Sequence, residues 1–570
     1  MTKLLNDPRA FSAEMLDGLV DANATRVQKV PGGVVRSTES APGKVAVVIG
    51  GGSGHYPAFA GLVGHGVADG AAVGDLFASP SAQQIVNVCR AADHGGGILL
   101  AFGNYAGDVL NFTLACEQLR VAEVDARIVR VTDDIASATK QDSENRRGIA
   151  GGLIVFKIAG AAAEAGLGLD EVERIARTAN ARTASIGVAF AGCTLPGSDT
   201  PLFEVPQGML GLGMGIHGEP GIHEQLLPRA DELGSLLVGQ LLAERPADSG
   251  SRAAVVLNGL GATKYEELFV LWRSISRCLA EAGVAVVEPE VGEYVTSLDM
   301  AGCSLSICWL DSEPEDLSRW WGAAADTPAY RKGNAPRAVP VRGPKLHRSR
   351  AEELPKSSAE SRRSAAAALR ALWAMRNALL LSETDLGRLD AIAGDGDHGL
   401  GMTRGCDAAT FAARRALGKG GGVRTVVMAA GEAWADRAGG TSGALWGAGI
   451  RAFGEALDDQ VRPTTSDLAR GAGAFTDTIR RLGNAAVGDK TMIDAAVPFA
   501  ASLSVAATEG CDPKVAWTRA AGRAHAAADQ TASLTPRLGR ARPLAARSLG
   551  SPDPGAVSFA LCMRAVAQTL

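Results

Sequence analysis

The chain has 570 residues, of which 46% are hydrophobic and 21% are charged, and its formal net charge is -5. This length exceeds what a single hydrophobic core usually serves, so we expect at least two domains. The balance of charge provides no broad basic surface and excludes a general nucleic-acid-binding protein, so an anionic substrate would have to be bound locally.

The amino-terminal residues carry no recognisable targeting signal. The stretch MTKLLNDPRAFSAEML lacks the apolar core of a signal peptide, and apolar stretches elsewhere are interrupted by Gly, Asp or Arg before they reach membrane-spanning length. The nine cysteines are scattered without CxxC spacing, which argues against a disulfide framework or a zinc site. We therefore expect a cytoplasmic protein that does not contact a membrane.

Short apolar runs alternate with helical patterns from about Lys44 to about Leu310. The runs are VAVVIG, GILLAF, ARIVRV, ASIGVAF, AAVVLNG, VAVVEP and SLSICWL. Runs of this length that end in Gly, Asp or Asn, separated by segments rich in Ala, Leu and Glu, are typical of buried strands in α/β layers. Residues 1–330 are therefore predicted to form an α/β domain.

The first strand-like run leads directly into GGGSGH, from Gly50 to His55. Successive small residues allow backbone amides to turn inward and contact a ligand. The spacing does not match a dinucleotide-binding fingerprint, and no Gly-rich loop followed by Lys and Ser or Thr occurs in the chain. By itself, the motif is equally consistent with a purely structural turn.

The second cluster is GNYAGD, from Gly103 to Asp108, again at the end of a strand-like run. That position places Asp108 at the sheet edge where α/β proteins bind their ligands, and its carboxylate could accept a proton from a sugar hydroxyl. The alternative is that Asp108 caps the helix that begins at VLNFTLA.

A third cluster, GMGIHGEPGIHE, contains His217, Glu219 and His223. The spacing of the two histidines is poor for a metal site, and Gly and Pro would break any helix there. A neutral imidazole can instead attack a ketone carbonyl and hold it covalently. Most isolated histidines have no such role, so the residues alone leave this open.

The composition changes between about Ala325 and Ser361, where Pro and basic residues are frequent and no apolar period is sustained. We assign residues 331–361 to a linker. Beyond it, SAAAALRALWAMRNALLLSE, RTVVMAAGEAWADRA and AWTRAAGRAHAAADQTA carry Ala, Leu and Arg at helical spacing. Residues 362–570 are therefore predicted to form an all-α domain.

The segment LDAIAGDGDHGLGM places Asp390, Asp395 and Asp397 within eight residues. Carboxylates this close repel one another, which favours a hard divalent cation between them, and Mg²⁺ fits because it takes few carboxylates. The alternative is an exposed acidic turn. AGGTSGALWG, GDKTMIDA and SLGSPDPGA add further loops, the first able to direct backbone N–H groups at phosphates.

Together these motifs resemble those of the dihydroxyacetone kinase family, in its single-chain form. GGGSGH, GNYAGD, RRGIAGG, GIHGEPGI, EYVTSLDMAG, GDGDHG, GGTSGALWG, GDKTM and SLGSPDPGA follow one another in the family's order. The resemblance covers almost the whole chain. It implies a keto-sugar-binding domain over residues 1–330 and an ATP-binding domain over 362–570, the latter an antiparallel helical barrel.

In the first domain, the resemblance implies that His217 forms a hemiaminal with the substrate ketone. His55 and Asp108 would act as an acid/base pair, and Gly52, Ser53 and Gly54 would line the pocket.

In the second domain, the resemblance implies that Asp390, Asp395 and Asp397 hold two Mg²⁺ ions that bridge the ATP phosphates. The residues that would contact the nucleotide are His398, Gly399, Leu400, Gly401, Thr441, Ser442, Gly483, Met492, Arg540, Asp553, Pro554 and Gly555. The family also suggests a homodimer.

The chain departs from the family pattern at two positions near the substrate. Members that act on dihydroxyacetone usually have Lys near the NY of the second motif, where this chain has Gly103, and GHEP where it has Tyr56. Loss of a long cationic side chain would free volume for one more hydroxymethylene. Near the carboxyl terminus, GRARPLAARSLG also departs from the family's more polar GRASYLGERS.

The sequence therefore predicts an ATP-dependent kinase acting on a primary hydroxyl of erythrulose, with D-erythrulose favoured and erythrulose 4-phosphate as the product. The main alternative is a dihydroxyacetone (glycerone) kinase. Also considered are an enzyme recharged by a phosphoprotein, an FAD-AMP lyase, and a non-catalytic sugar-sensing regulator.

Overall fold

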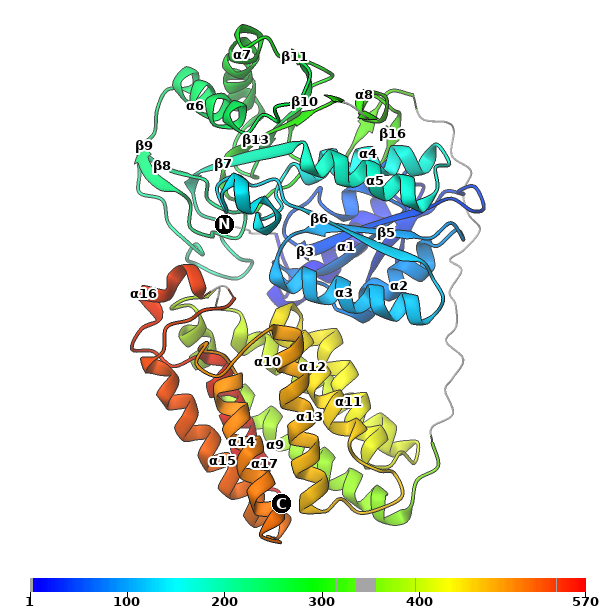
Figure 1. Cartoon of the computed structure of the whole chain (residues 1–570), viewed down its shortest axis with the longest axis vertical. Coiled ribbons are helices and arrows are strands. Elements are labelled where there is room, and N and C mark those ends of the chain that lie inside the picture. The colour runs from blue at the N-terminus through cyan, green and yellow to red at the C-terminus, as the bar shows by residue number, and fades with distance from the viewer. Residues whose placement is uncertain (1–3, 313–314, 335–354, 395, 540) are drawn as a thin grey trace. The chain divides into compact units, whose positions relative to one another are not determined.

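A computed structural model describes residues 4–312, 315–334, 355–394, 396–539 and 541–570. The chain divides into two compact units, Met1–His347 and Arg348–Leu570. The first unit is built from sheets and helices and the second from helices (Figure 1). The predicted succession of an α/β region and an all-α region is confirmed.

The first large sheet has the strand order β1-β2-β4-β3-β5-β6 and is parallel from β4 to β6. Its strands are β1 (Val27–Val30), β2 (Gly33–Arg36), β3 (Ala46–Ser53), β4 (Gly70–Leu76), β5 (Ile98–Gly103) and β6 (Ala126–Val131). The predicted runs VAVVIG, GILLAF and ARIVRV correspond to β3, β5 and β6. Because these strands are parallel, the loops that follow them meet at one edge of the sheet.

The second large sheet has the order β11-β10-β13-β7-β8-β9, with β12 also paired to β10. Its strands are β7 (Thr183–Ala191), β8 (Met209–Leu212), β9 (His223–Leu226), β10 (Arg252–Gly259), β11 (Ala285–Val286), β12 (Glu290–Gly292) and β13 (Ala301–Trp309). The run VAVVEP was expected to be a full strand, but only Ala285 and Val286 pair. Glu288 adopts a positive φ of 44° and Pro289 lacks an N–H, so the ladder is interrupted there.

Helices form layers on both sides of these sheets. Helices α2 (Ala82–Ala92) and α3 (Ala106–Val121) pack on one face of the first sheet. Helices α4 (Gly152–Glu164) and α5 (Leu169–Ala181) share a core with the opposite face and also with strands of the second sheet. Helices α6 (Ala230–Ala243) and α7 (Tyr265–Glu281) cover the remaining face of the second sheet. The helices α4 and α5 therefore form a layer that both sheets contact.

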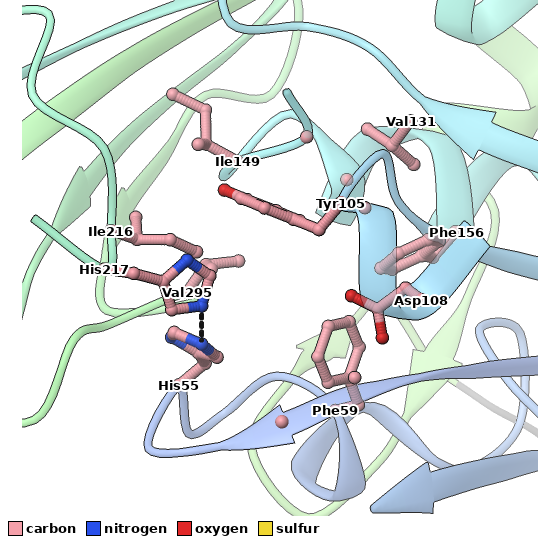
Figure 2. Close-up of a pocket in the computed structure, with 15 residues that line it drawn as sticks. His55, Phe59, Tyr105, Asp108, Val131, Ile149, Phe156, Ile216, His217 and Val295 are labelled. Carbon is pink, nitrogen blue, oxygen red and sulfur yellow. Dashed lines mark hydrogen bonds between the residues drawn. The ribbon is translucent and has the colours of Figure 1, made fainter. Parts of the chain in front are cut away.

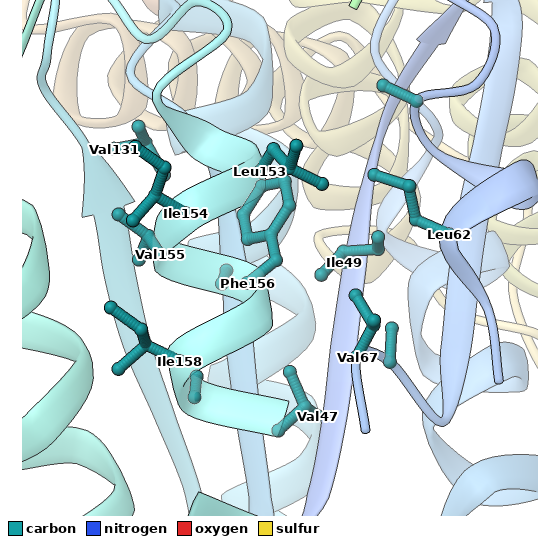
Figure 3. Packing of buried hydrophobic residues seen from close by; sticks show 14 of the residues in the cluster. Val47, Ile49, Leu62, Val67, Val131, Leu153, Ile154, Val155, Phe156 and Ile158 are labelled. Atoms are coloured by element: carbon teal, nitrogen blue, oxygen red, sulfur yellow. The ribbon is translucent and has the colours of Figure 1, made fainter. Parts of the chain in front are cut away.

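The side chains of strand β3 explain this layering. Val47 and Ile49 belong to the core shared with α4, whereas Val48 belongs to the core on the other face. Figure 3 shows Ile49 facing Leu153 and Phe156 of α4. Successive side chains of a strand point to opposite faces, so a continuously apolar run such as VAVVIG requires cover on both sides.

Smaller elements complete the first unit and extend into the expected linker. These are α1 (Phe11–Ala22), α8 (Ser318–Trp321) and the hairpins β14 (Asp311–Ser312) with β15 (Glu315–Asp316) and β16 (Ala325–Asp326) with β17 (Arg331–Lys332). Lys332 is buried over the ring of Trp321, 4.0 Å from its centre, so the chain is still packed on the first unit at residue 332. The stretch 335–354 of the expected linker lies outside the described residues.

The second unit is a closed ring of antiparallel helices. Each long helix contacts the next long helix along the chain, so that α15 contacts α17 and the short α16 stands outside the ring, and α17 returns to contact α9. The helices are α9 (Ala359–Asp390), α10 (His398–Gly418), α11 (Val423–Ala438), α12 (Gly440–Glu455), α13 (Thr465–Gly483), α14 (Ile493–Thr508), α15 (Pro513–Gln530), α16 (Ala545–Ser548) and α17 (Pro554–Ala567). Helix α9 begins at Ala359, three residues before the expected start at 362.

None of the helices in the described parts of the chain is long and apolar enough to cross a membrane.

A buried group of charged side chains lies at the amino-terminal end of β3 and β4. The Nζ atom of Lys44 lies 2.6 Å from a carboxylate oxygen of Asp69, and Arg36 pairs with both Asp69 and Glu164. Burial acts to raise the pKa of Asp69, but Lys44, His94 and Arg36 hold it well below its ordinary range. His65, Lys44 and Arg36 likewise lower the pKa of Glu164 to about 2, against the effect of burial.

We predict that Asp69→Asn lowers the free energy of unfolding by about 3–5 kcal/mol, because it leaves Glu164 as the only carboxylate among those described here to neutralise the two buried cations Lys44 and Arg36. The native pKa of Asp69 lies below its unfolded value, so its stabilisation is present above that value and is lost as the pH falls through the native pKa. The measurement is urea unfolding of the full chain at several pH values. Asp125→Asn, which breaks an exposed pair with Arg127, is the control, with an expected loss below about 1 kcal/mol. Equal losses for the two variants would contradict the prediction.

Candidate active site

A pocket opens at the edge of the first sheet where β3, β5 and β6 end. Figure 2 shows its wall, to which strand ends, the first turn of α3, the start of α4 and two loops of the second sheet contribute. The lining residues are Gly51, Gly52, His55, Phe59, Gly103, Tyr105, Asp108, Val131, Gly148, Ile149, Gly152, Phe156, Ile216, His217 and Val295. One cavity is therefore lined by three side chains that are far apart along the chain, those of His55, Asp108 and His217.

The GGGSGH turn is constrained mainly by close packing. A Cβ atom on Gly52 would lie 2.7 Å from the amide nitrogen of Ala78, and Gly54 has a φ of 99°. The hydroxyl of Ser53 donates to the carbonyl of Gly74 at 2.6 Å. Of the three residues expected to line the pocket here, Gly52 does so, and Ser53 and Gly54 hold the turn that presents His55.

His55 and His217 face each other at one side of the pocket. Their Nε2 atoms are 3.0 Å apart, and their rings are nearly perpendicular. The Nδ1–H of His55 donates to the carbonyl of Thr296 at 2.7 Å, and Nδ1 of His217 lies 3.0 Å from a carboxylate oxygen of Glu219. Since a carbonyl and a carboxylate only accept hydrogen bonds, both Nδ1 atoms carry hydrogen, and the contact between the Nε2 atoms requires one further proton.

The lowered pKa of His55 decides the role of this ring in the contact. Burial, together with the charge on His217, lowers the pKa of His55 to about 3, so His55 is neutral and its Nε2 atom accepts. Burial acts to raise the pKa of Glu219, but His217 and Arg147 hold it well below its ordinary range. His217 and Glu219 thus lie in ion-pair contact in a partly buried position, and the neutral His55 directs a lone pair at the ring of His217.

Tyr105 forms the wall above the two histidines. Its ring lies edge-on to that of His217, with 4.8 Å between centres, and its buried hydroxyl finds no hydrogen-bond partner among the described residues. A Cβ atom added to Gly103 would lie 3.1 Å from the Tyr105 ring and 3.3 Å from the carbonyl of Gly148. The space beside Gly103 is therefore bounded by Tyr105, and a longer side chain there would displace that ring.

Asp108 lies across the pocket from the histidines (Figure 2). It is buried in the first turn of α3, where Tyr105 is the residue that precedes the helix. Asp108 is therefore inside the helix and not its cap, and the positive end of the helix dipole favours its carboxylate form. A carboxylate in this position can accept a proton from a hydroxyl held in the pocket.

Two other residues noted in the sequence analysis, Tyr56 and His223, lie outside the pocket lining. The side chain of Tyr56 is 42% exposed. His223 is exposed on β9 and its ring contacts Gln225. Neither residue is among those that line the pocket.

In the second unit, the expected nucleotide residues lie at helix ends. His398 to Gly401 begin α10, Thr441 and Ser442 begin α12, Gly483 ends α13, Met492 precedes α14, and Asp553 to Gly555 begin α17. Because neighbouring helices are antiparallel, all these ends lie at the same end of the ring. Four helix amino termini therefore gather there, and such termini favour phosphate groups. Arg540 lies outside the described residues.

Carboxylates crowd this same end of the ring. Asp390 accepts hydrogen bonds from the amides of Gly396 and His398, and Asp553 caps α17 by accepting from Ala556. Burial, together with the charges of Asp494 and Asp390, raises the pKa of Asp553 to about 7.

The metal ligands expected from the sequence are only partly described. Among the described residues no three carboxylate, His or Cys side chains are close enough together to hold a metal ion, and Asp395 lies outside them. The crowding of negative charge around Asp390 and Asp553 nonetheless fits a hard divalent cation, which would relieve it.

The sequence did not identify several residues that build the site. Glu219 was noted only as a neighbour of His217, Tyr105 only as part of a motif, and Thr296 only within EYVTSLDMAG. The occurrence of that segment among the family motifs was the available signal, but its contact with His55 spans 241 positions and cannot be seen from spacing.

Comparison with protein families gives two matches. The Dak1 domain matches residues 17–329, and the DAK2 domain matches residues 392–568.

Similar curated proteins match over the full length. The chain is 54% identical to a D-erythrulose kinase of Mycolicibacterium smegmatis, covering 100% of this chain and 98% of the relative. It is 52% identical to an L-erythrulose kinase of Pectobacterium atrosepticum, covering 100% and 97%. Among solved structures, the dihydroxyacetone kinase from C. freundii in complex with AMP-PNP and Mg²⁺ is 30% identical, with a TM-score of 0.52 and full coverage of both chains.

We predict that Glu219→Gln removes the shared proton from the histidine pair at neutral pH, because the amide keeps the shape of the carboxylate but not its charge. The measurement is the ¹⁵N NMR spectrum of protein labelled at its eight histidines, in which both ring nitrogens of His217 are protonated only before the substitution. His223→Gln, an exposed change outside the pocket, serves as the control. An unchanged ring signal for His217 in Glu219→Gln would show that the charge of Glu219 does not hold the proton.

Proposed function

This chain belongs to the dihydroxyacetone kinase family, with the Dak1 and DAK2 domains in one chain, and from that premise we propose that it is an ATP-dependent erythrulose kinase. The observation that carries the proposal is its identity of more than 50% with two erythrulose kinases over its whole length. The phosphate acceptor is a primary hydroxyl, and D-erythrulose is the favoured substrate, with erythrulose 4-phosphate as the product. Relatives of nearly equal similarity are named for either enantiomer, so both are tested below.

The first step is capture of the ketone by His217. The Nε2 proton of His217 passes to Nε2 of His55, which lies 3.0 Å away. The freed lone pair of His217 attacks the ketone carbon, and His55 delivers the proton to the carbonyl oxygen, which becomes the hydroxyl of a hemiaminal. The alkylated ring of His217 is again a cation, so the positive charge that passed briefly to His55 is once more paired with Glu219. No charge is created in the buried pocket, which keeps the barrier low.

The second step is phosphoryl transfer. Asp108 accepts the proton of the primary hydroxyl while the hydroxyl oxygen bonds to the γ-phosphorus of ATP and the bond between that phosphorus and ADP breaks. Covalent capture fixes the sugar relative to Asp108. The hydroxyl and the carboxylate are then held in a reactive orientation and do not have to meet by diffusion. Return of the proton through His55 reverses the hemiaminal and releases the phosphorylated ketose.

The second unit holds the nucleotide in this proposal. The helix amino termini of α10, α12, α14 and α17 would favour the phosphates. The nucleotide contacts that the resemblance implies are His398 to Gly401, Thr441, Ser442, Gly483, Met492, Arg540 and Asp553 to Gly555. Asp390, Asp395 and Asp397 would hold two Mg²⁺ ions, which neutralise phosphate charge when bound.

We assign the selection of substrate length to Gly103 and Tyr105. Without a side chain at position 103, the Tyr105 ring keeps its place beside His217, and no Lys or Arg is among the described residues that line the pocket. The pocket then accepts a ketose with one hydroxymethylene more than dihydroxyacetone.

We also propose that the enzyme works as a homodimer in the cytoplasm. The nine cysteines are all free, and seven of them are buried, which is typical of proteins of a reducing compartment. The homodimer rests on the family resemblance, and size-exclusion chromatography with light scattering tests it.

We predict that one erythrulose enantiomer exceeds dihydroxyacetone by at least about tenfold in kcat/KM, as expected for one additional group in a fitted pocket. The measurement is ADP release with Mg-ATP and equal concentrations of D-erythrulose, L-erythrulose, dihydroxyacetone or glycerol. Glycerol, which lacks a ketone, should give no turnover. Gly103→Lys should shift the preference towards dihydroxyacetone, whereas Tyr56→Glu, outside the pocket lining, should not. A wild-type preference for dihydroxyacetone would retain the kinase and contradict the assignment of erythrulose.

We predict that Asp395→Asn lowers kcat by at least about a hundredfold, because neutralisation of phosphate charge is lost, and leaves sugar binding unchanged. The measurements are ADP release and isothermal titration with the preferred ketose. Asp407→Asn is the matched control, since Asp407 is on α10 but pairs with Arg376 away from the helix start. If Asp395→Asn abolished ketose binding, the proposed division of labour between the units would be wrong.

A further inference from the structure

The segment Tyr294 to Leu298, here called the bridging segment, passes between the loops that carry the two histidines. It belongs to EYVTSLDMAG, to which the sequence assigned no role. Its backbone and side chains bond to both loops and to the end of β10, and Val295 lines the pocket. The function proposed above assigns no task to these residues.

On one side, the bridging segment is paired with the loop of His55. The amide of Thr296 donates to the carbonyl of His55 at 3.2 Å, and its carbonyl accepts from Nδ1 of the same residue at 2.7 Å. The amide of Leu298 donates to Gly54 at 2.9 Å, and that of Ala58 donates to Tyr294 at 3.0 Å. These bonds fix both the position of His55 and its tautomer.

On the other side, the segment reaches the loop of His217 through one side chain. The hydroxyl of Ser297 donates to the carbonyl of Ile216, the residue directly before His217. Ser297 is fully buried, and its amide also donates to the carbonyl of Leu260 just beyond β10. The segment that orients His55 therefore also holds the backbone next to His217.

Asn258, at the end of β10, anchors the bridging segment. Its Oδ1 atom accepts from the amides of Tyr294 and Val295 at 2.8 and 3.0 Å. Its Nδ2 atom donates to the carbonyl of Val295 at 2.8 Å and to the hydroxyl of Ser304 at 3.2 Å. Both donors and both acceptor sites of the amide are therefore used, in a side chain that is fully buried.

We propose that Ser297 and Asn258 are positioning residues that hold His55 and His217 at the separation at which they share one proton. Neither residue lines the pocket, so both act through the histidines. The proposal deepens the ketose kinase function and rests on it for its kinetic consequences, although the geometry of the histidine pair can be tested without turnover.

Buried hydrogen bonds elsewhere in the same sheet provide a matched comparison. The hydroxyls of Ser185 on β7 and Ser306 on β13 are 2.6 Å apart, and both residues are fully buried. Ser306→Ala thus removes a buried serine hydroxyl and one hydrogen bond, as Ser297→Ala does, but touches neither histidine loop. A difference between these variants reports the position of the histidines and not the general loss of a buried bond.

The experiment compares Ser297→Ala with Ser306→Ala in the full chain. We expect Ser297→Ala to lose roughly ten- to a hundredfold in kcat/KM for the preferred ketose, the size of effect that a misplaced reacting group produces, with the KM for ATP unchanged. Ser306→Ala should keep the wild-type kcat/KM. In ¹⁵N NMR spectra, the signal of the proton between the histidines should be lost in Ser297→Ala and kept in Ser306→Ala.

Asn258→Asp provides a second, nearly isosteric variant. It keeps the acceptors for the amides of Tyr294 and Val295 but replaces the donor to the Val295 carbonyl by a second oxygen, which repels it. We expect the same loss of the shared-proton signal and a raised KM for the ketose. Circular dichroism establishes whether this variant folds, and if it does not, the pair of serine variants decides.

Equal kcat/KM values and equal NMR spectra for the two serine variants would overturn the proposal. If wild-type protein phosphorylated none of the ketoses, the proposed function would fail, and the NMR comparison would still decide whether Ser297 positions the histidine pair.

Discussion

Two imidazole nitrogens 3.0 Å apart repel each other through their lone pairs unless a proton lies between them. In this protein the outer nitrogen of each ring is already committed, to Thr296 for His55 and to Glu219 for His217. The pair must therefore carry one positive charge, and the partly buried carboxylate of Glu219 compensates that charge. The chemistry proposed for the pocket follows from this constraint, since the proton needed to complete ketone capture is present before the substrate arrives.

The fold has to bring this pair together from two different sheets. His55 follows β3 of the first sheet, and His217 lies between β8 and β9 of the second. The layer of α4 and α5, whose side chains contact both sheets, sets the distance between them. The start of α4 also supplies part of the pocket wall. Packing of the apolar core therefore also determines where the two imidazole rings lie.

The helical unit addresses a different electrostatic problem. An antiparallel ring of helices places amino termini at one end, where backbone N–H groups and helix dipoles favour anions. The same end contains Asp390, Asp494 and Asp553, and burial together with the charges of Asp494 and Asp390 raises the pKa of Asp553. The helix termini that favour phosphate therefore lie close to the carboxylates that need a cation. This arrangement suits a metal–nucleotide complex. In the proposed function the first unit, by contrast, binds an uncharged sugar, and the net charge of its histidine pair does not change.

The sequence by itself determined the α/β and all-α regions, the central strands β3, β5, β6, β7, β10 and β13, and the candidates His55, Asp108 and His217, because apolar period and local motifs are properties of neighbouring residues. It missed short strands such as β1, β8 and β9, and it overextended VAVVEP, whose pairing ends where the backbone turns at Glu288. Only the tertiary structure decided that Thr296 orients His55, that Asn258 anchors Tyr294 and Val295, and that Tyr105 bounds the space beside Gly103. The contact between Thr296 and His55 joins positions 241 residues apart, and such a hydrogen bond depends on how layers pack and not on any pattern along the chain.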